Sequence, residues 1–288
     1  MARLAFLGTG LLGGAFAEAA AKRGDTVVAW NRSPDKARAL APFGVAAAAT
    51  PAEAVAGASR AHLALKDDAV VEEVIAAARP GLAADAVLVD HSTTLPALTA
   101  ERAVRLGAQG IAYLHCPVSM SPAAVRSAQG LMLAAGPKAV FERVRADLEK
   151  MTGRLSYVGE RPDLAAVYKL LANALSLGIR GVLSDILAIA KAADVTAEDT
   201  VKMLGLLDVH AFVIGRANSM IKGDFTPTFE LTMARKDVRL MIETAGDLPL
   251  AALPSLAARM DALIAAGRGG QDASVLVVDS LRANGNIP

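Results

Sequence analysis

The first half of the chain alternates short apolar runs with longer segments in which apolar residues recur at helical spacing. Short apolar runs bounded by Gly, Pro or Asp are typical of buried strands, and their alternation with helices is typical of a parallel sheet built from βαβ units. The pattern predicts helices over 11–23 and about 35–40, with another that begins at Pro51. It predicts strands over 4–7, 26–30, a short stretch near Val45, 62–65, 87–90, 112–115, 131–134 and 155–158.

The pattern changes near Pro162, after which it is helical to the end of the chain. Pro is favoured in the first turn of a helix, and Asp163 beside it would interact well with the helix dipole. Helices are expected over 163–192, 197–206, 210–221, 229–245, 256–266 and 272–282. We therefore expect an α/β fold, with an N-terminal Rossmann-type doubly wound sheet in residues 1–161 and an all-helical C-terminal domain in 162–288, joined by a long interdomain helix.

Composition limits the partners that the chain is expected to have. Hydrophobic residues make up 53% of the chain and aromatic residues only 4%, so the core is expected to consist mainly of Ala, Leu and Val. Lys and Arg (30) nearly balance Asp and Glu (29), and this balance argues against a general nucleic-acid binder. Cys116 is the single cysteine, which excludes an intrachain disulfide and favours a reducing cytoplasm.

Membrane association is not expected either. The apolar run at the N-terminus meets Gly8 at once, which leaves it too short for a signal peptide. The Ala-rich stretches are interrupted by charges or Pro before they reach the length that spans a bilayer. These features predict a soluble, cytoplasmic protein.

A glycine-rich turn follows the first predicted strand and opens the first predicted helix. It matches G-x-G-x-x-G and consists of Gly8, Thr9, Gly10, Leu11, Leu12 and Gly13. In this motif the first glycine permits a tight turn, the second lets a pyrophosphate approach the backbone, and the third lets the helix and strand pack closely. The free N–H groups and the dipole of the helix N-terminus attract the phosphates. The turn therefore predicts a bound dinucleotide, with all six residues as cofactor contacts.

The end of the second predicted strand indicates which dinucleotide is bound. An NAD site usually has Asp or Glu near this point, which accepts hydrogen bonds from the ribose hydroxyls. This chain has Asn31, Arg32 and Ser33, with Lys36 one helical turn later. A carboxylate would repel a 2′-phosphate, whereas Arg32 can bind it through charge-assisted hydrogen bonds. We therefore expect NADP, with NAD as the alternative, although a solvated surface Arg would give the same pattern.

With these residues in view, the chain resembles the β-hydroxyacid dehydrogenase family, which includes 3-hydroxyisobutyrate dehydrogenases and glyoxylate/succinic semialdehyde reductases and is similar to 6-phosphogluconate dehydrogenase. The resemblance implies an NADP-dependent oxidoreductase that interconverts a small β-hydroxy acid, or a related alcohol, and its aldehyde or ketone by hydride transfer. It covers nearly the whole chain and rests on the order and spacing of five features: the turn at 8–13 with Asn31-Arg32-Ser33, Asp90-His91-Ser92-Thr93, Pro117-Val118-Ser119, Lys169 with Asn173, and Lys236-Asp237.

The resemblance implies that Lys169 and Asn173 are catalytic and contact the substrate, because the segment matches the family's Lys-x-x-x-Asn core. Residues i and i+4 share one helix face, so both side chains can point into one cleft. Apolar neighbours would lower the pKa of Lys169 toward the working pH. Lys169 would then donate a proton during reduction and accept it during oxidation, while Asn173 polarises the substrate. The alternative is a surface Lys beside a polar Asn, which is common on helices.

The resemblance also assigns residues at two other strand ends. Ser92 would bind the substrate and Thr93 the nicotinamide half of the cofactor, because both follow a predicted strand that ends in a Rossmann crevice. The alternative role for Ser92 and Thr93 is that of a helix cap. For Lys236 and Asp237 the alternative is an ordinary solvated helix face. The further cofactor contacts that the resemblance implies are Leu65, Lys66 and, from the helical domain, Lys236.

The substrate loop departs from the family pattern. Where the family usually reads Pro-Val-Ser-Gly-Gly, this chain continues after Ser119 with Met120, Ser121 and Pro122. Ser119 and Ser121 can still contact a substrate carboxylate, but Met120 adds bulk and Pro122 lacks a backbone donor. We expect Ser119, Met120 and Ser121 to contact the substrate. A more apolar or larger aldehyde is therefore an alternative to a small aldehyde acid.

Two rival functions stay open. An imine reductase would share the architecture, although such relatives generally carry Asp or Tyr at the position of Lys169. A catalytically silent NADPH-binding module would be free to lose Lys169 or Asn173, and this chain has both. Nicotinamide-dependent hydride transfer therefore stays the leading prediction.

No metal site is expected. The adjacent His115 and Cys116 would face opposite ways on a strand, so they would chelate a metal poorly. The histidines lie far apart in sequence, at His62, His91, His115 and His210.

The helical half favours self-association. A long helix rich in Ala and Leu, joined to a small helical domain, needs a partner to bury its second face. We therefore expect a homodimer or homotetramer that packs through the helical halves.

Overall fold

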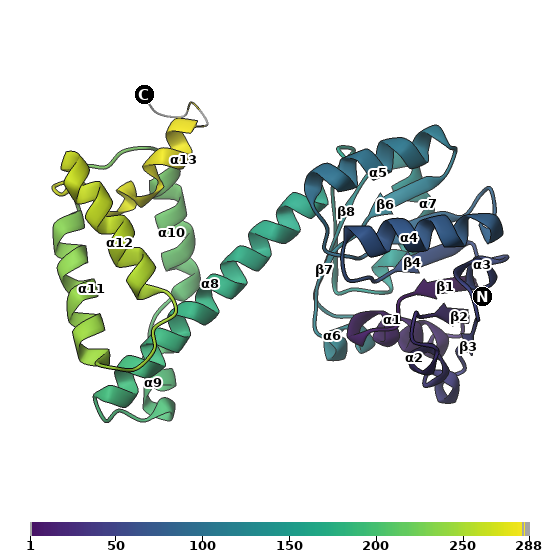
Figure 1. The fold of residues 1–288 in the computed structure, drawn as a ribbon, viewed down its shortest axis with the longest axis horizontal. Helices are drawn as coiled ribbons and strands as arrows, with labels where there is room; N and C mark the ends of the chain where they lie inside the picture. Colours follow the sequence, from purple (N-terminus) through teal and green to yellow (C-terminus); the bar gives the residue numbers. More distant parts are fainter. Residues whose placement is uncertain (1, 284, 286–288) are drawn as a thin grey trace. The chain divides into compact units, whose positions relative to one another are not determined.

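The computed structural model describes residues 2–283 and 285, and it divides into two compact units, Met1–Asn173 and Ala174–Pro288 (Figure 1). The division falls inside the long helix α8 (Leu164–Ala192), because the start of this helix packs with the N-terminal unit. Ala165 and Ala166, in its first turn, are fully buried. The predicted boundary after residue 161 lies just before this helix.

In the described part of the N-terminal unit, nine strands form one sheet in the order β3-β2-β1-β4-β5-β6-β8-β7, with β9 paired to β8. Neighbouring strands from β3 to β6 are parallel, whereas β8 runs antiparallel to β6 and β7. The order 3-2-1-4-5-6 is that of a doubly wound dinucleotide-binding sheet, so the predicted fold class is confirmed. The strands are β1 (Arg3–Leu7), β2 (Thr26–Trp30), β3 (Ala46–Ala47), β4 (Arg60–Leu63), β5 (Val87–Asp90), β6 (Ala112–His115), β7 (Val118–Ser119), β8 (Leu131–Ala135) and β9 (Arg154–Gly159).

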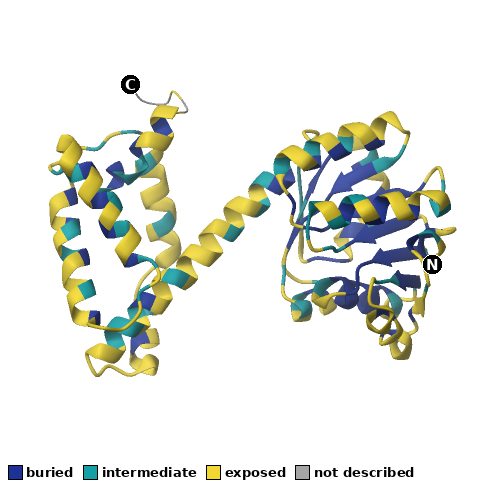
Figure 2. Cartoon of the chain, in the orientation of Figure 1, coloured by how far each residue is buried: buried dark blue, intermediate teal, exposed yellow. Residues whose placement is uncertain are grey.

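The central strands are buried on both faces, as Figure 2 shows. Leu4 and Phe6 of β1 pack in one hydrophobic cluster with Phe16, whereas Ala5 and Leu7 pack in a second cluster. Successive strand residues point to opposite faces, so a continuous apolar strand indicates a sheet covered on both sides. The helical segments of this unit are α1 (Leu11–Lys22), α2 (Pro34–Arg38), η1 (Ala41–Phe43), α3 (Pro51–Val55), α4 (Asp68–Ala78), η2 (Arg79–Gly81), α5 (Pro96–Ala108), α6 (Pro122–Arg126) and α7 (Lys138–Glu149).

The helical unit has its own apolar core, which includes Leu231, Met260 and Val275. A buried carboxylate on α8, that of Asp185, joins this helix to the next segment by accepting hydrogen bonds from three consecutive backbone N–H groups, of residues 251–253, at 2.6, 2.9 and 2.8 Å. Burial opposes ionisation of Asp185, but these donors outweigh it and hold its pKa below the ordinary value. The helices are α9 (Ala197–Leu204), α10 (Val209–Ile221), α11 (Leu231–Ala245), α12 (Leu253–Leu263), η3 (Ile264–Arg268), η4 (Ala273–Val277) and α13 (Val278–Ala283).

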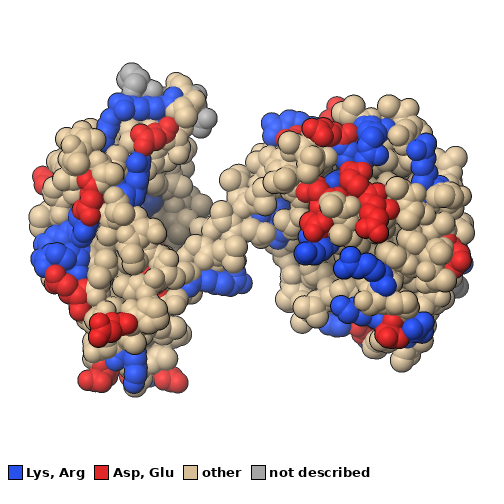
Figure 3. Space-filling model, viewed as in Figure 1, with Lys and Arg blue, Asp and Glu red and all other residues tan. Residues whose placement is uncertain are grey.

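The expectation that charges or Pro interrupt every long apolar stretch is wrong for α8. This helix contains an 18-residue window of mean hydropathy 1.4, long and apolar enough by composition to cross a bilayer. Its charged residues are too widely spaced to interrupt the stretch, since none lies between Lys169 and Arg180. A core helix of a soluble protein passes the same test, but only 6% of the window is buried within this chain. Figure 3 shows few charged side chains along α8, in contrast to the mixed charges over α4 and α5.

Candidate functional site

A cleft of about 710 Å³ opens at the carboxyl ends of β1, β2, β4 and β5 in the N-terminal unit. Strand order reverses there, because β2 lies on one side of β1 and β4 on the other. Open α/β sheets bind their ligands at this switch point. The predicted site residues that line the cleft are Gly8, Gly10, Leu11, Leu12, Gly13, Asn31, Arg32, Ser33, Lys36, Leu65, Lys66, Ser92, Thr93 and Met120.

The glycine turn has the geometry that its sequence predicts. Gly8 has φ +94°, and a Cβ on this residue would lie 2.5 Å from the Ala64 carbonyl oxygen. A Cβ on Gly13 would lie 1.9 Å from the Gly8 carbonyl oxygen, so both positions exclude a side chain. A Cβ on Gly10 would meet nothing within 4 Å, which leaves open space beside the backbone. No side chain caps α1 and no acidic residue lies in its first turn, so its N–H groups can bind an anion.

Asn31 connects the glycine turn to the loop after β2. Its Oδ1 accepts a hydrogen bond from the Thr9 N–H at 2.9 Å, and its Nδ2 donates to the Ser33 carbonyl at 3.1 Å. Thr9 is buried and does not line the cleft, although we expected it to contact the cofactor. Asn31 therefore lies in the cleft wall and also fixes the turn.

The loop after β2 presents two cations to the cleft. Arg32 and Lys36 both line it and both are exposed. Among the described residues, neither has a carboxylate within 4 Å, whereas the nearby Arg38 is paired with Asp35. The two cations are therefore available to an anionic ligand.

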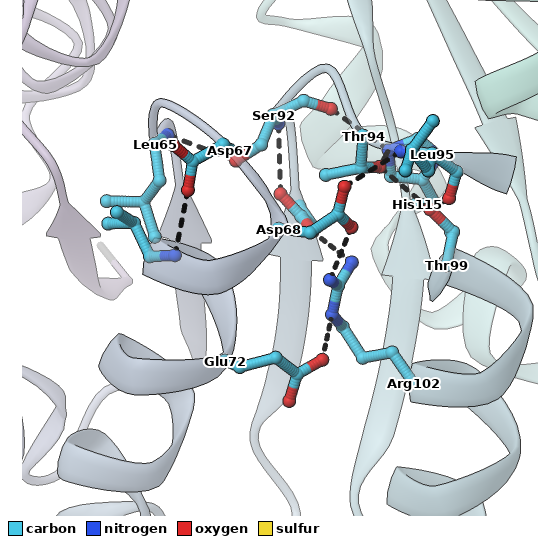
Figure 4. Close-up of polar contacts among 12 residues, drawn as sticks. Leu65, Asp67, Asp68, Glu72, Ser92, Thr94, Leu95, Thr99, Arg102 and His115 are labelled. Carbon is cyan, nitrogen blue, oxygen red and sulfur yellow. Dashed lines mark hydrogen bonds and ion pairs between the residues drawn. The ribbon is translucent and has the colours of Figure 1, made fainter. Parts of the chain in front are cut away.

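Two loops form the opposite end of the cleft. Figure 4 shows the polar contacts that join these loops. Ser92 is buried, and its Oγ accepts a hydrogen bond from the Leu65 N–H at 3.0 Å, which ties the loop after β5 to the loop after β4. The Ser92 N–H donates to Asp90 Oδ1 at 2.9 Å. Neither Ser92 nor Thr93 caps α5, whose N-cap is Leu95, so the helix-cap alternative is excluded.

The substrate loop contributes Met120 to the cleft, but Ser119 and Ser121 do not line it. Ser119 is exposed in β7. Ser121 is the N-cap of α6, since its Oγ accepts from the Ala124 N–H at 3.2 Å, although its O–H can still donate. The loop therefore offers an apolar side chain where the family usually has glycine.

An ion pair holds this loop to the helix that follows the glycine turn. Arg126, at the end of α6, donates to Glu18 of α1 at 2.7 Å, and Lys22 donates to the same carboxylate at 2.6 Å. Only 6% of the Glu18 side chain is exposed. The hydrogen bonds from Lys22 and Arg126 lower the pKa of Glu18, which therefore stays ionised.

Lys169 and Asn173 lie one turn apart on α8 and are both half-buried. Burial lowers the pKa of Lys169 below its ordinary value, as the sequence led us to expect. Neither residue is among those that line the 710 Å³ cleft. Lys236 lies on α11 in the helical unit, where its Nζ is 3.0 Å from Asp237 Oδ1.

Three of the histidines, which lie far apart in the sequence and were expected to stay apart, come together in the fold. His91 Nδ1 donates to the Cys116 carbonyl at 2.7 Å, so the neutral ring accepts at Nε2 from His62 Nδ1, 3.0 Å away. The two rings stack, and the nearby His115 is also buried and contacts the Ser92 carbonyl at 3.0 Å. Parallel strands bring these distant residues together. Within residues 2–283 and 285 no group of three or more His, Cys, Asp or Glu side chains is placed to hold a metal.

These histidines predict a loss of stability in mild acid. Burial lowers the pKa of His91 from 6.5 to about 4 and that of His62 well below its usual range. The unfolded chain therefore binds protons that the folded chain does not, and stability present above pH 6.5 is lost as the pH falls toward 4. His91 alone accounts for about 3 kcal/mol. The free energy of unfolding, measured with urea across this pH range, should fall as the pH is lowered. His91→Gln should make this fall smaller, whereas the control His210→Gln, at an exposed histidine, should leave it unchanged. An equally steep fall in the wild-type protein and both variants would contradict the prediction.

Several cleft residues were not predicted from the sequence. His91 follows a parallel strand at its carboxyl end, and that position was a usable signal, but within the Asp90-His91-Ser92-Thr93 segment we assigned contacts only to Ser92 and Thr93. The residues from α4 carry no recognisable signal because only the tertiary fold places that helix beside the cleft. The cleft residues missed are Trp30, Ala64, Val70, Glu73, Val74, His91 and Pro122.

Two family models match the chain on either side of the start of α8. Residues 3–159 match the NAD binding domain of 6-phosphogluconate dehydrogenase. Residues 164–278 match the NAD-binding domain of NADP-dependent 3-hydroxyisobutyrate dehydrogenase. Together they cover the sheet with its cleft and nearly all of the helical half.

Individual relatives align over almost their full length. The 3-sulfolactaldehyde reductase of Escherichia coli (strain K12) is 26% identical over 285 residues, which cover 96% of this chain and 95% of that protein. Glyoxylate/succinic semialdehyde reductase 1 of Arabidopsis thaliana is 26% identical over 282 residues, which cover 94% of this chain and 96% of that protein. The structure of a Streptomyces aurantiacus imine reductase is similar with a TM-score of 0.84 and 26% identity, covering 96% of this chain and 98% of that one.

Proposed function

Because the chain belongs to the β-hydroxyacid dehydrogenase family and is an NAD(P)-dependent oxidoreductase that acts on CH–OH groups, we propose that it interconverts a small aldehyde acid and its hydroxy acid with NADP(H). One observation carries the proposal. The glycine turn, the loops after β4 and β5, and two cations with no carboxylate partner among the described residues line a single cleft at the switch point of the sheet. The named substrates of two relatives, sulfolactaldehyde and glyoxylate or succinic semialdehyde, are aldehydes that carry an acid group.

The cleft offers a distinct set of residues to each part of the dinucleotide. When bound, the nicotinamide ring supplies a hydride for reduction or accepts one for oxidation. The N–H groups at the start of α1 would bind the pyrophosphate, and the open space at Gly10 would let it approach. Leu65, Lys66 and Thr93 would contact the nicotinamide half. The cofactor contact expected of Lys236 stays a prediction.

Arg32 is proposed to select NADP over NAD. Hydrogen bonds between charged groups contribute about 1.5–3 kcal/mol, so Arg32→Ala should lower kcat/KM for NADPH by about 10–100-fold. The value for NADH should change by less than about threefold, because NADH lacks the 2′-phosphate. Arg38→Ala is the matched control, since Arg38 is exposed on the same segment, pairs with Asp35 and does not line the cleft. Equal losses with both cofactors would show that Arg32 does not contact the 2′ position.

Lys169 and Asn173 are proposed to act on the oxygen of the substrate. In reduction Lys169 would give a proton to the oxygen that becomes the alcohol, and in oxidation it would take that proton back. Partial burial, which lowers its pKa, brings proton exchange closer to working pH. Asn173, one turn away, would hold and polarise the carbonyl. The hydroxyls of Ser92, Ser119 and Ser121 would donate to the acid group of the substrate.

A panel of substrates tests the proposed function. NADPH oxidation should be fastest with glyoxylate or succinic semialdehyde, and slower with neutral aldehydes of the same length. The opposite order would indicate that Met120 has replaced the acid anchor with an apolar contact. Binding of NADPH without turnover of any substrate in the panel would favour a silent module.

Imine reduction is the second candidate, because a solved imine reductase is 26% identical to this chain. The resemblance in the sequence argues against it, since imine reductases generally have Asp or Tyr at the position of Lys169. A cyclic imine is therefore added to the panel. Faster turnover of the imine than of any aldehyde would reverse the ranking.

The helical unit is proposed to pair with a second copy of the chain, giving a cytoplasmic homodimer or homotetramer. Apolar side chains are widely exposed on α8 and α10, for example Leu171 (61%), Leu177 (64%) and Phe212 (63%). A chain of 29.6 kDa should therefore scatter light as at least twice that mass at micromolar concentration. Leu177→Glu should lower the mass, whereas Leu95→Glu, at an exposed leucine of the N-terminal unit, should not. A monomer, or a protein that sediments with vesicles, would contradict the proposal.

A further inference from the structure

A fully buried arginine lies behind the loops that form one end of the cleft. Arg102, in the middle of α5, has no exposed side-chain surface. Its Nη2 donates to Asp68 Oδ1 and its Nε to Glu72 Oε1, both at 2.7 Å, while Nη1 lies 3.6 Å from Asp90 Oδ2 (Figure 4). Removing a guanidinium from water costs several kcal/mol unless carboxylates surround it. Arg102 is therefore stable here only while these acidic side chains keep their places.

The same carboxylates also bind the backbone of the loop after β5, and one of them comes from the end of the loop after β4. Asp68, just after the loop that carries Leu65, uses its second oxygen to accept from the Leu95 N–H at 2.9 Å. Asp90 uses its first oxygen to accept from the Ser92 N–H at 2.9 Å. Asp68 thus bonds Arg102 with one oxygen and a loop amide with the other. Asp90 Oδ2 accepts a hydrogen bond from the Tyr113 hydroxyl at 2.9 Å and also lies beside the charge of Arg102, which helps to hold this carboxylate in place.

The same two loops line the cleft. The loop after β4 places Leu65 and Lys66 in the cleft, and the loop after β5 places Ser92 and Thr93 there. A direct bond from the Leu65 N–H to Ser92 Oγ links them on the cleft side. Arg102 links them on the far side through Asp68, at a position that does not line the cleft.

We propose that Arg102 is a positioning residue that fixes the nicotinamide end of the cleft by clamping the loops after β4 and β5 through Asp68 and Asp90. The proposal rests on the proposed function for the identity of the ligand. It does not depend on which aldehyde is reduced. Loss of the clamp should affect the nicotinamide half of the cofactor and leave the adenosine half, which lies at the other end of the cleft, unchanged.

The test compares Arg102→Met with Arg105→Met. Arg105 lies one turn further along α5 and also pairs with Glu72, but its side chain is 45% exposed, and among the described residues it makes no ion pair with Asp68 or Asp90. In the ligand-free protein, hydrogen exchange at the amides of Leu65, Ser92 and Leu95 should be at least about tenfold faster in Arg102→Met and unchanged in Arg105→Met. The value of kcat/KM for NADPH should fall at least about tenfold in Arg102→Met. The affinity for 2′,5′-ADP, which carries the adenosine half alone, should stay within about twofold.

Several outcomes would overturn the proposal. Unchanged amide exchange would show that Arg102 does not hold the loops. Equal losses of NADPH and 2′,5′-ADP binding would show a general structural role instead. Should Arg102→Met fail to fold, Asp68→Asn replaces it, because it removes the charge that faces Arg102 but keeps an oxygen for the Leu95 N–H. Faster amide exchange at Leu65, Ser92 and Leu95 in Asp68→Asn would support the proposal, and unchanged exchange would overturn it. If the wild-type protein binds neither probe, the proposed function fails, and the exchange measurements still decide the role of Arg102.

Discussion

Replacing Lys169 by Met is expected to lower kcat about 10²–10⁴-fold while the affinity for NADPH changes by less than about threefold. The ammonium is the group proposed to give the substrate oxygen its proton, and Met keeps the length and packing of the side chain without an ionisable group. The loss should appear in both reaction directions, because one residue serves as acid and as base.

The pH profile of the wild-type enzyme provides a second check. Reduction needs the protonated amine, so its rate should fall as the pH rises through the pKa of Lys169, whereas oxidation needs the neutral amine and should rise over the same range. Burial lowers this pKa below the ordinary value, so both changes should occur below the range of a solvated lysine. Lys191→Met, at an exposed lysine in the last turn of α8, is the matched control. Full activity in Lys169→Met would end the assignment.

Adding one methyl group at Gly10 is expected to weaken NADPH binding by about 10–100-fold without changing the fold. A Cβ there meets no protein atom within 4 Å, and the backbone conformation, φ −65° and ψ −168°, has a negative φ and lies at the edge of the extended region that is open to alanine. The methyl group would instead occupy the space through which the pyrophosphate approaches the backbone.

Gly13→Ala provides the contrast. A Cβ at this position would lie 1.9 Å from the Gly8 carbonyl oxygen, so the turn must shift and both stability and binding should fall. Thermal unfolding and NADPH titration separate the two cases: Gly10→Ala should keep the Tm of the wild-type protein, and Gly13→Ala should lower it by several degrees. Normal NADPH affinity in Gly10→Ala would mean that no phosphate passes close to this residue.

The strands of the sheet were well predicted because a parallel sheet imposes a strong constraint on sequence. Strands such as 26–30 and 87–90 are covered on both faces, which leaves an unbroken apolar run between polar turns. Strand β7 was missed because it has two residues, too few to show any periodicity. The boundary between compact units was harder to predict, since α8 continues through it without a break.

The residues that line the cleft were predictable where a sequence motif fixes the backbone. They were harder to predict where only the tertiary fold brings a residue to the cleft. The spacing of Gly8, Gly10 and Gly13 specifies a turn whose geometry the structure reproduces. By contrast, nothing near Glu73 in sequence indicates that it lines the same cleft, because only the tertiary fold places α4 there. The contacts of Arg102 could not be predicted from the sequence. Its partners lie 12 to 34 residues away along the chain, and only the order of the strands brings them together.

The bond between Glu18 and Arg126 has a consequence for protein engineering. A chimaera that imports segment 119–126 from another enzyme, in order to change its selectivity, also replaces the partner of a carboxylate whose side chain is only 6% exposed. Unless the donor sequence brings its own cation, Lys22 alone would neutralise that acid, and the packing of α6 on the second half of α1, the helix that follows the glycine turn, would be disturbed. Selectivity and cofactor affinity should therefore be inherited together, and grafts that ignore position 126 should fail in both.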